Sequence, residues 1–193
     1  MKKYSYQNYQ NYLNAQIETT TKKMGRMSWI EDRIINTIAD YVGDCESVLC
    51  HGTRSGEEQI KFKERFGEHC FVVGSELHPD GAKYPMTVVH DFNEVNEEWV
   101  GRFSVVYSNA LDHCFDPEKT LSVWSNQVNE NGKLIIEWHP GSGGHNNVSA
   151  SDPFTATDFE IGEIMLRNNF KIEATLLPNK TKHAGSLLVY SRG

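Results

Sequence analysis

The segment from Ser47 to Glu58, SVLCHGTRSGEE, places polar residues and glycines directly after an apolar run, which is where ligands bind in open α/β sheets. Val48 to Cys50 is predicted to be a buried strand of a parallel sheet. Gly52 follows it, and a glycine there lets the backbone turn and approach a ligand closely. We therefore expect a ligand site at the carboxyl end of this strand.

The glycine turn differs from the two common phosphate-binding motifs. HGTRSG has glycines at positions 52 and 56 only, so the G-x-G-x-x-G fingerprint fails, and two glutamates stand where a P-loop has Lys and Ser or Thr. Acidic residues at a helix N-terminus repel a pyrophosphate, which favours a neutral or cationic ligand. The next helix is expected at about residues 56–66, with Ser55 as its N-cap and Glu58 completing a capping box.

Acidic residues also follow the next two predicted strands. Residues 70–75 form a buried strand that ends at Glu76, about twenty residues past the glycine turn, where such folds hold ribose hydroxyls. Residues 86–90 form a third strand, and the short connection to it favours a loop or a single turn over a crossover helix. Asp91 and Phe92 then supply an acid and an aromatic ring that could flank a base. Alternatively, Phe92 packs in the core and Asp91 caps a turn.

Two helices are predicted before the first strand. The first, within residues 4–24, has a thin apolar stripe and is expected to lie over the domain, and the second, at about residues 28–41, takes Ser28 as its N-cap. After the third strand, helices and strands alternate and end in an antiparallel hairpin. These elements are a strand at 103–107, a helix from Asp116 to about Asn129, a turn at Asn131-Gly132, a strand at 133–138, a loop at 139–155, a helix at about 157–168 and strands at 170–177 and 186–190.

This order of elements predicts an α/β fold. We expect a three-layer Rossmann-like sandwich with a mostly parallel sheet, an antiparallel terminal strand and an N-terminal helical cap. Residues 1–43 are expected to form the cap, as part of the same domain as residues 44–193.

Composition limits the partners of the chain. A net charge of −7 gives no general electrostatic attraction to nucleic acid, although a local basic patch stays open. No apolar run approaches the roughly 20 residues that a membrane span needs. The first residues also lack the apolar core of a signal peptide, so we expect a cytoplasmic protein with no membrane partner. The sequence does not indicate an oligomeric state.

Cysteine and histidine spacing gives no sign of a metal site. The four cysteines show no C-x-x-C pair and are expected to be free thiols. Four histidines lie near predicted strand ends, but their spacing matches no ligand pattern, so no metal is expected. They are His51, His78, His90 and His139.

The order of motifs resembles the class I S-adenosylmethionine-dependent methyltransferases, in particular the small methyltransferase type 11 domain, over about residues 46–190. The segments that carry the resemblance are VLCHGTRSGEE, VVGSELHP, VVHDFNE and FSVVYSNALDHCFDPEKTLSVWSNQVNENGKLIIEW. The last is the most specific. The family typically shows an E-H or D-H pair, a helix opening near D-P and a G-G-x-L turn, here at residues 112–113, 116–117 and 131–134.

The resemblance implies S-adenosylmethionine as the cofactor, with residues 44–193 as the domain that binds it. Its sulfonium and ammonium groups suit carboxylates and carbonyls and need no anion cradle. The implied cofactor residues lie at the ends of four strands. They are Gly52, Thr53 and Arg54 under the methionine part, Glu76 at the ribose hydroxyls, Leu77 at the border of the adenine, Asp91 at its amino group, Phe92 on its ring face, and Asn109, Ala110 and Leu111 along the cofactor.

The implied reaction is methyl transfer, an in-line displacement for which the protein mainly positions the reactants. A hydroxyl acceptor needs a general base, for which His113 is the first candidate and His139 the second, although either could have a structural role. The N-terminal helix, with Tyr9, Tyr12, Gln16 and Lys23, and the 139–155 loop could close over a small pocket, which favours a small-molecule acceptor.

Two other classes of function are weighed against this one. A binding or regulatory protein that keeps the fold without transfer activity is favoured by the turn's single glycine, where many family members have two or three. A short NAD-dependent reductase is disfavoured by the missing fingerprint and by the absence of a Tyr-x-x-x-Lys pair.

Overall fold

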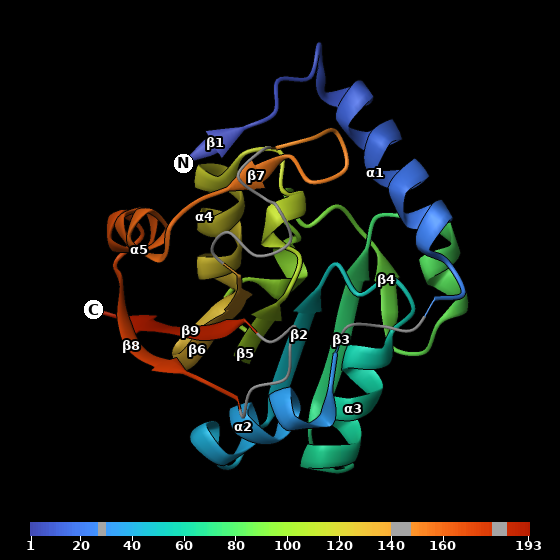
Figure 1. Ribbon diagram of the computed structural model, residues 1–193. Helices are drawn as coiled ribbons and strands as arrows, with labels where there is room; N and C mark the ends of the chain where they lie inside the picture. Colours follow the sequence, from blue (N-terminus) through green and yellow to red (C-terminus); the bar gives the residue numbers. More distant parts are fainter. Residues whose placement is uncertain (27–29, 140–147, 179–184) are drawn as a thin grey trace.

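The computed structural model describes residues 1–26, 30–139, 148–178 and 185–193. Within these ranges the core is a seven-stranded sheet in the order β4-β3-β2-β5-β6-β9-β8, with helices against both faces (Figure 1). Neighbouring strands from β4 to β6 are parallel, whereas β9 runs antiparallel to β6 and β8. The strands are β2 Ser47–His51, β3 Phe71–Glu76, β4 Thr87–Val89, β5 Phe103–Ser108, β6 Val128–Trp138, β8 Phe170–Leu176 and β9 Ser186–Arg192.

Helices form the outer layers, and a small second sheet pairs β1 with β7. The connection between β3 and β4 is a short 3-10 helix, as predicted. The predicted three-layer α/β sandwich is therefore confirmed. The remaining elements are β1 Lys2–Lys3, β7 Phe154–Thr155, α1 Tyr9–Lys23, α2 Asp32–Val42, α3 Glu57–Phe66, α4 Pro117–Gln127, α5 Asp158–Arg167, η1 Pro79–Lys83, η2 Glu97–Trp99 and η3 Leu111–His113.

Each face of the sheet has its own core, because alternate side chains of a strand point to opposite faces. Val48 and Cys50 of β2 belong to the core formed with α2 and α3. Leu49, between them, belongs to the core formed with α4 and α5. A strand buried on both faces reads as a continuous apolar run, which is why this strand was predictable from the sequence. The four cysteines are buried free thiols, as expected.

α1 lies outside these two helical layers and crosses the carboxyl ends of the strands (Figure 1). Tyr9 bonds to Asp91 after β4, and Tyr12 bonds to the carbonyl oxygen of His113 after β5. This arrangement places the helix over the edge of the sheet where ligands bind in such folds. The domain boundary at residue 43 stays a prediction.

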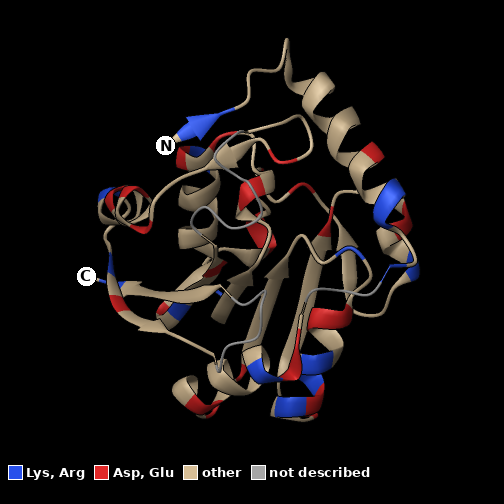
Figure 2. Cartoon of the chain, in the orientation of Figure 1, with Lys and Arg blue, Asp and Glu red and all other residues tan. Residues whose placement is uncertain are grey.

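Charged residues are distributed unevenly around the sheet (Figure 2). Lys and Arg residues occur in the last turns of α1 and α3, whereas Asp112 and Asp116 lie between β5 and α4. No helix in the described part of the chain combines the length and the apolar character needed to cross a bilayer.

The predicted N-caps of α2 and α3 are both wrong. α2 begins at Asp32 after Glu31, so Ser28, which lies outside the described residues, is not its cap. α3 begins after Gly56, whose φ of 75° is left-handed, and no side chain caps it. The capping box of Ser55 and Glu58 is absent because the chain turns at Gly56 instead. The left-handed φ favours glycine, and a Cβ there would make a tight contact of 3.2 Å with Oγ1 of Thr87 in β4.

The predicted turn at residues 131–132 is also wrong. α4 ends at Gln127, and residue 128 already belongs to β6, which continues through the predicted turn. The pairing register of β6 with β5 shifts in this region, so the extra residues form an irregularity within the ladder. Gly132 packs against the sheet there, since a Cβ would lie 2.6 Å from the carbonyl oxygen of Phe103.

Candidate functional site

The glycine turn brings three of the predicted cofactor residues together at the carboxyl edge of the sheet. Gly52 has a left-handed φ of 73°, and its N–H donates to the carbonyl oxygen of Ser75 over 2.9 Å. A Cβ at Gly52 would lie 2.6 Å from Cβ of Ala110 and 3.4 Å from Cε1 of Phe92. Residues that follow β2, β4 and β5 therefore meet at one glycine, and a larger residue there would collide with the end of β5.

Glu76 faces this turn from the end of β3. Its Oε2 accepts a 2.8 Å hydrogen bond from the N–H of Arg54, and its Oε1 accepts one of 2.8 Å from the N–H of His78. The residue is only 4% exposed, and Gly81 packs against its side chain. A carboxylate oxygen can accept more than one hydrogen bond, so each oxygen can still accept a hydroxyl. Leu77, beside it, is half-buried.

Asp91 and Phe92 adopt the alternative arrangement considered from the sequence. Oδ1 of Asp91 accepts a 2.9 Å hydrogen bond from the N–H of Asn93 and so caps a turn, while Oδ2 accepts a 2.5 Å bond from the hydroxyl of Tyr9. Phe92 is buried and meets Trp124 edge to face, with 5.4 Å between the ring centroids. Their assignment to the adenine stays a prediction.

Asn93 is a central residue of this edge that the sequence did not single out. Its Nδ2 donates to the hydroxyl of Tyr12 over 2.7 Å and to Oδ1 of Asp91 over 2.6 Å. Its Oδ1 accepts from the N–H of Phe115 over 3.1 Å and from Oγ1 of Thr120 over 2.7 Å. The buried amide thus joins α1, the end of β4 and the start of α4. The sequence Asp91-Phe92-Asn93 would look the same if the asparagine were exposed, so the pattern gave no signal for this role.

Aromatic rings attach α1 to this edge. Tyr9 and Phe115 meet edge to face with 4.9 Å between ring centroids, and Tyr12 lies 5.2 Å from the same ring. Burial raises the pKa of the Tyr9 hydroxyl, and its hydrogen bond to Asp91 raises it further. Burial also raises the pKa of Tyr12. Both hydroxyls therefore stay protonated and donate.

The residues predicted along the cofactor after β5 differ in exposure. Asn109 is half-buried, whereas Ala110 is 6% exposed and Leu111 is part of the core. The N–H of Ala110 donates to Oγ of Ser108 over 3.0 Å, and that hydroxyl donates to the carbonyl oxygen of His51 over 3.1 Å. The ends of β2 and β5 are therefore tied together beside the glycine turn.

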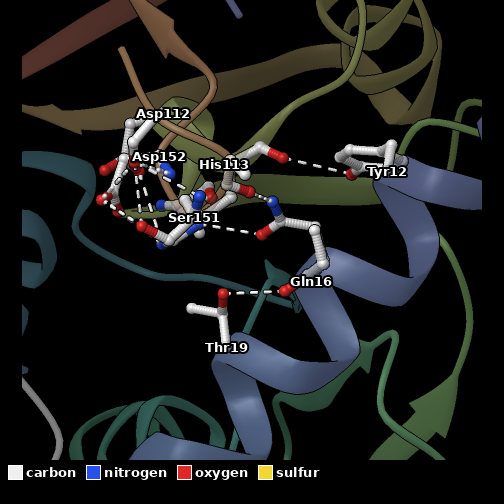
Figure 3. Close-up of polar contacts among 12 residues, drawn as sticks. Tyr12, Gln16, Thr19, Asp112, His113, Ser151 and Asp152 are labelled. Carbon is white, nitrogen blue, oxygen red and sulfur yellow. Dashed lines mark hydrogen bonds and ion pairs between the residues drawn. The ribbon is translucent and has the colours of Figure 1, made fainter. Parts of the chain in front are cut away.

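His113 lies in η3, between α1 and the segment that precedes β7 (Figure 3). Its Nδ1 is 2.7 Å from the carbonyl oxygen of Ser151 and 3.1 Å from Oε1 of Gln16. Its Nε2 is 3.9 Å from Oδ1 of Asp152 and 4.0 Å from Oδ1 of Asp112. His113, Asp112 and Asp152 each have one possible ligand atom within 4.8 Å of those of the other two. Such spacing is common among exposed acidic groups and alone identifies no metal ligand.

His139 belongs to a different group of residues. Its Nε2 is 3.6 Å from Oε1 of Glu137, whose Oε2 accepts a 2.8 Å hydrogen bond from the hydroxyl of Tyr107. The ring packs beside Gly185, where a Cβ would lie 2.7 Å from Cδ2 of His139. The contacts of the two candidate bases are therefore with separate parts of the chain. Residues 140–147 of the predicted 139–155 loop lie outside the described residues.

A mostly parallel seven-stranded sheet with one antiparallel strand, in the described part of the chain, and helices on both faces is the Rossmann-like fold of class I S-adenosylmethionine-dependent methyltransferases. The candidate residues lie at the carboxyl ends of its strands, where ligands bind in open α/β sheets.

Solved structures with this fold cover nearly the whole chain at low sequence identity. The 1,6-didemethyltoxoflavin-N1-methyltransferase of Burkholderia thailandensis has a TM-score of 0.72 at 16% identity, covering 97% of this chain and 90% of its own. The magnesium protoporphyrin IX methyltransferase of Synechocystis has a TM-score of 0.69 at 12% identity, covering 98% and 100%. A sugar N-methyltransferase of Streptoalloteichus has a TM-score of 0.67 at 14% identity, covering 91% and 92%. Neither protein-family models nor curated protein sequences gave a match.

Proposed function

We propose that the protein is an S-adenosylmethionine-dependent methyltransferase that acts on a small-molecule acceptor. The observation that carries the proposal is the Glu76 carboxylate opposite the Gly52 turn, at the carboxyl edge of a methyltransferase fold. Two similar proteins are described with bound S-adenosylhomocysteine or S-adenosylmethionine. Their names and that of the sugar methyltransferase describe small acceptors, which supports the acceptor class.

The residues of the edge fit the cofactor by chemistry. Gly52 leaves the backbone of the turn without a side chain, and the methionine part would lie against this turn, which also holds Thr53 and Arg54. Glu76 would hold the ribose hydroxyls with the lone pairs that the backbone N–H groups leave. Leu77 would border the adenine.

The adenine and the outer cofactor edge would use residues from the next strands. Asp91 and Phe92 would face the adenine amino group and ring, and the amino group would compete with the Tyr9 hydroxyl for Oδ2 of Asp91. The residues along the rest of the cofactor would be Asn109, Ala110 and Leu111.

When bound, the cofactor supplies a methyl group already activated by its sulfonium. The protein then has to orient the acceptor and, for a hydroxyl or an ammonium, remove its proton. His113 is the stronger candidate base, because it follows β5 directly beyond Ala110, which meets the glycine turn. His139 is the second candidate.

The cofactor site is tested by isothermal calorimetry with S-adenosylmethionine and S-adenosylhomocysteine. We expect micromolar binding that weakens about tenfold or more in Glu76→Ala, which corresponds to about 1.4 kcal/mol. Glu97→Ala, which removes an exposed carboxylate from η2, is the matched control and should bind as the wild type. Absence of binding by the folded wild type would refute the proposed function.

A second candidate is a regulatory protein that keeps the fold without transfer activity. The bond between Tyr9 and Asp91 favours it, because it occupies a carboxylate that the cofactor would need. Turnover of S-adenosylmethionine against a panel of hydroxyl, amine and carboxylate compounds separates the two. With an acceptor found, His113→Ala should lower kcat by about a hundredfold or more, while His139→Ala should change it much less. Cofactor binding without turnover across the panel would favour the regulatory protein.

A further inference from the structure

We propose that Gln16 is a positioning residue that holds the His113 ring with Nδ1 protonated, so that Nε2 is the basic nitrogen. The proposal rests on the proposed function, in which Nε2 would take the proton of the methyl acceptor. It adds a role for α1, which carries Gln16, and it names the atom that acts.

The tautomer follows from the two partners of Nδ1. The carbonyl oxygen of Ser151, at 2.7 Å, can only accept a hydrogen bond. The amide of Gln16 presents Oε1 to the ring at 3.1 Å, because its Nε2 donates to the carbonyl oxygen of Ala150 over 3.1 Å and to the hydroxyl of Tyr6 over 3.3 Å. Nδ1 thus has two acceptors and must carry the hydrogen. In the neutral ring the lone pair is then on Nε2.

The two buried residues of α1 both form hydrogen bonds with His113. The helix buries two residues, Tyr12 and Gln16, which lie one turn apart on the same face. Tyr12 donates to the backbone carbonyl oxygen of His113 over 3.1 Å, and Gln16 accepts from its ring (Figure 3). The helix therefore fixes both the backbone and the ring of one residue. A buried glutamine with all its polar atoms bonded to protein has little freedom to turn away.

Two carboxylates lie near the nitrogen that would take the proton. Nε2 is 3.9 Å from Oδ1 of Asp152 and 4.0 Å from Oδ1 of Asp112, and both distances are longer than a hydrogen bond. In the step, the acceptor atom would give its proton to Nε2, its lone pair would form the bond to the methyl carbon, and the carbon–sulfur bond would break with its electron pair on sulfur.

The test measures the tautomer directly by long-range proton–nitrogen correlation NMR on the labelled full chain, at a pH where the ring is neutral. His113→Gln identifies the signals. We expect the wild type to show the Nδ1-protonated pattern. In Gln16→Leu we expect the two ring nitrogens to become more alike, because one of the two acceptors is lost. Gln16→Glu keeps an acceptor oxygen and should restore the pattern.

Gln10→Leu is the matched control, since Gln10 lies on the exposed side of the same helix and bonds to Asn14. It should leave the His113 signals unchanged. With an acceptor found, Gln16→Leu should lower kcat about ten- to a hundredfold, the cost of a misplaced catalytic group, with little change in cofactor Kd. Gln16→Glu should recover part of this loss.

A wild-type ring with Nε2 protonated would overturn the proposal, and this measurement needs no variant to fold. Unchanged signals and an unchanged kcat in Gln16→Leu would also overturn the role of Gln16. Calorimetry distinguishes these results from a failure of the proposed function. Cofactor binding with the wrong tautomer counts against this inference alone, whereas absence of cofactor binding removes the reaction that His113 would serve.

Discussion

The hydroxyl of Tyr9 lies 2.5 Å from Oδ2 of Asp91, so the N-terminal helix holds the carboxylate that the methyltransferase resemblance assigns to the adenine amino group. Oδ1 of the same carboxylate accepts from the backbone and side-chain nitrogens of Asn93, at 2.9 and 2.6 Å. Each oxygen of Asp91 therefore already has a donor within the protein. Under the proposed function, docking of α1 and binding of an adenine would compete for Oδ2 of Asp91.

We expect Tyr9→Phe to strengthen S-adenosylmethionine binding. The variant keeps the ring against Phe115 and removes only the competing hydroxyl. A net hydrogen bond of about 1 kcal/mol predicts an increase in affinity of about fivefold, measured by calorimetry. Tyr4→Phe, on a more exposed ring of the same segment, is the control and should leave the affinity unchanged. Weaker binding in Tyr9→Phe would mean that Tyr9 supports the site.

Gly52→Ala should destabilise the fold and abolish cofactor binding. The added Cβ would meet Cβ of Ala110 at 2.6 Å, and the φ of 73° is unfavourable for alanine. Gly43 is a matched control, because its φ is 76° and nothing lies within 4 Å of an added Cβ. Gly43→Ala should cost about 1–3 kcal/mol for the backbone alone, since its φ of 76° and ψ of −130° are rare for residues other than glycine, and Gly52→Ala about 1–3 kcal/mol more for the collision. Urea denaturation measures both. Equal losses of unfolding free energy in the two variants would show that position 52 accepts an alanine without a collision.

Asn93→Ala should loosen α1 from the edge of the sheet. It removes the acceptor of the Phe115 N–H, and a buried polar group without a partner costs about 1–3 kcal/mol. It also removes the donor to the Tyr12 hydroxyl, which keeps its own bond to the carbonyl oxygen of His113. We expect a loss of roughly 2–4 kcal/mol in the free energy of unfolding, with faster hydrogen exchange in α1. Asn96→Ala removes only a bond to the N–H of Glu98 at the surface and should cost far less. Similar losses in the two variants would contradict the central role of Asn93.

The sheet could be predicted from the sequence because its signals are local. Strands buried on both faces read as apolar runs, as at Val48 to Cys50, and their order along the chain fits one α/β topology. Helix ends could not be read as well. Ser55 and Glu58 match a capping box, but α3 begins after Gly56, whose left-handed conformation the sequence pattern alone does not reveal.

The candidate site was predictable where topology alone decides it. Gly52, Phe92 and Ala110 follow strands whose carboxyl ends meet, so their proximity follows from the fold. Asn93 was missed because a polar residue in a turn is usually exposed. Gln16 was predicted only as one of several helix residues over a pocket, because its bond to His113 depends on how α1 packs on the edge of the sheet.

His51 should make stability depend on pH. The ring is fully buried, with Nε2 2.7 Å from Oε1 of Gln127 and Nδ1 2.7 Å from Oγ of Ser75, and burial lowers its pKa from 6.5 to about 3. As pH falls below 6.5, the unfolded chain takes up a proton that the folded chain excludes until about pH 3. The contribution of His51 to the free energy of unfolding is therefore fully present above the unfolded pKa of 6.5. It is lost by about 1.4 kcal/mol per pH unit as the pH falls from 6.5 toward 3.

The measurement is urea denaturation of the wild type and of His51→Gln between pH 6.5 and about pH 3. The difference between the two pH profiles separates the contribution of His51 from that of the acidic residues. The variant removes the titrating ring, so its stability should fall less steeply with pH than that of the wild type. His69→Gln, which removes an exposed histidine, is the control and should keep the steep dependence because the buried ring is still present. Parallel pH curves for the wild type and His51→Gln would mean that the folded chain protonates His51 as readily as the unfolded chain does.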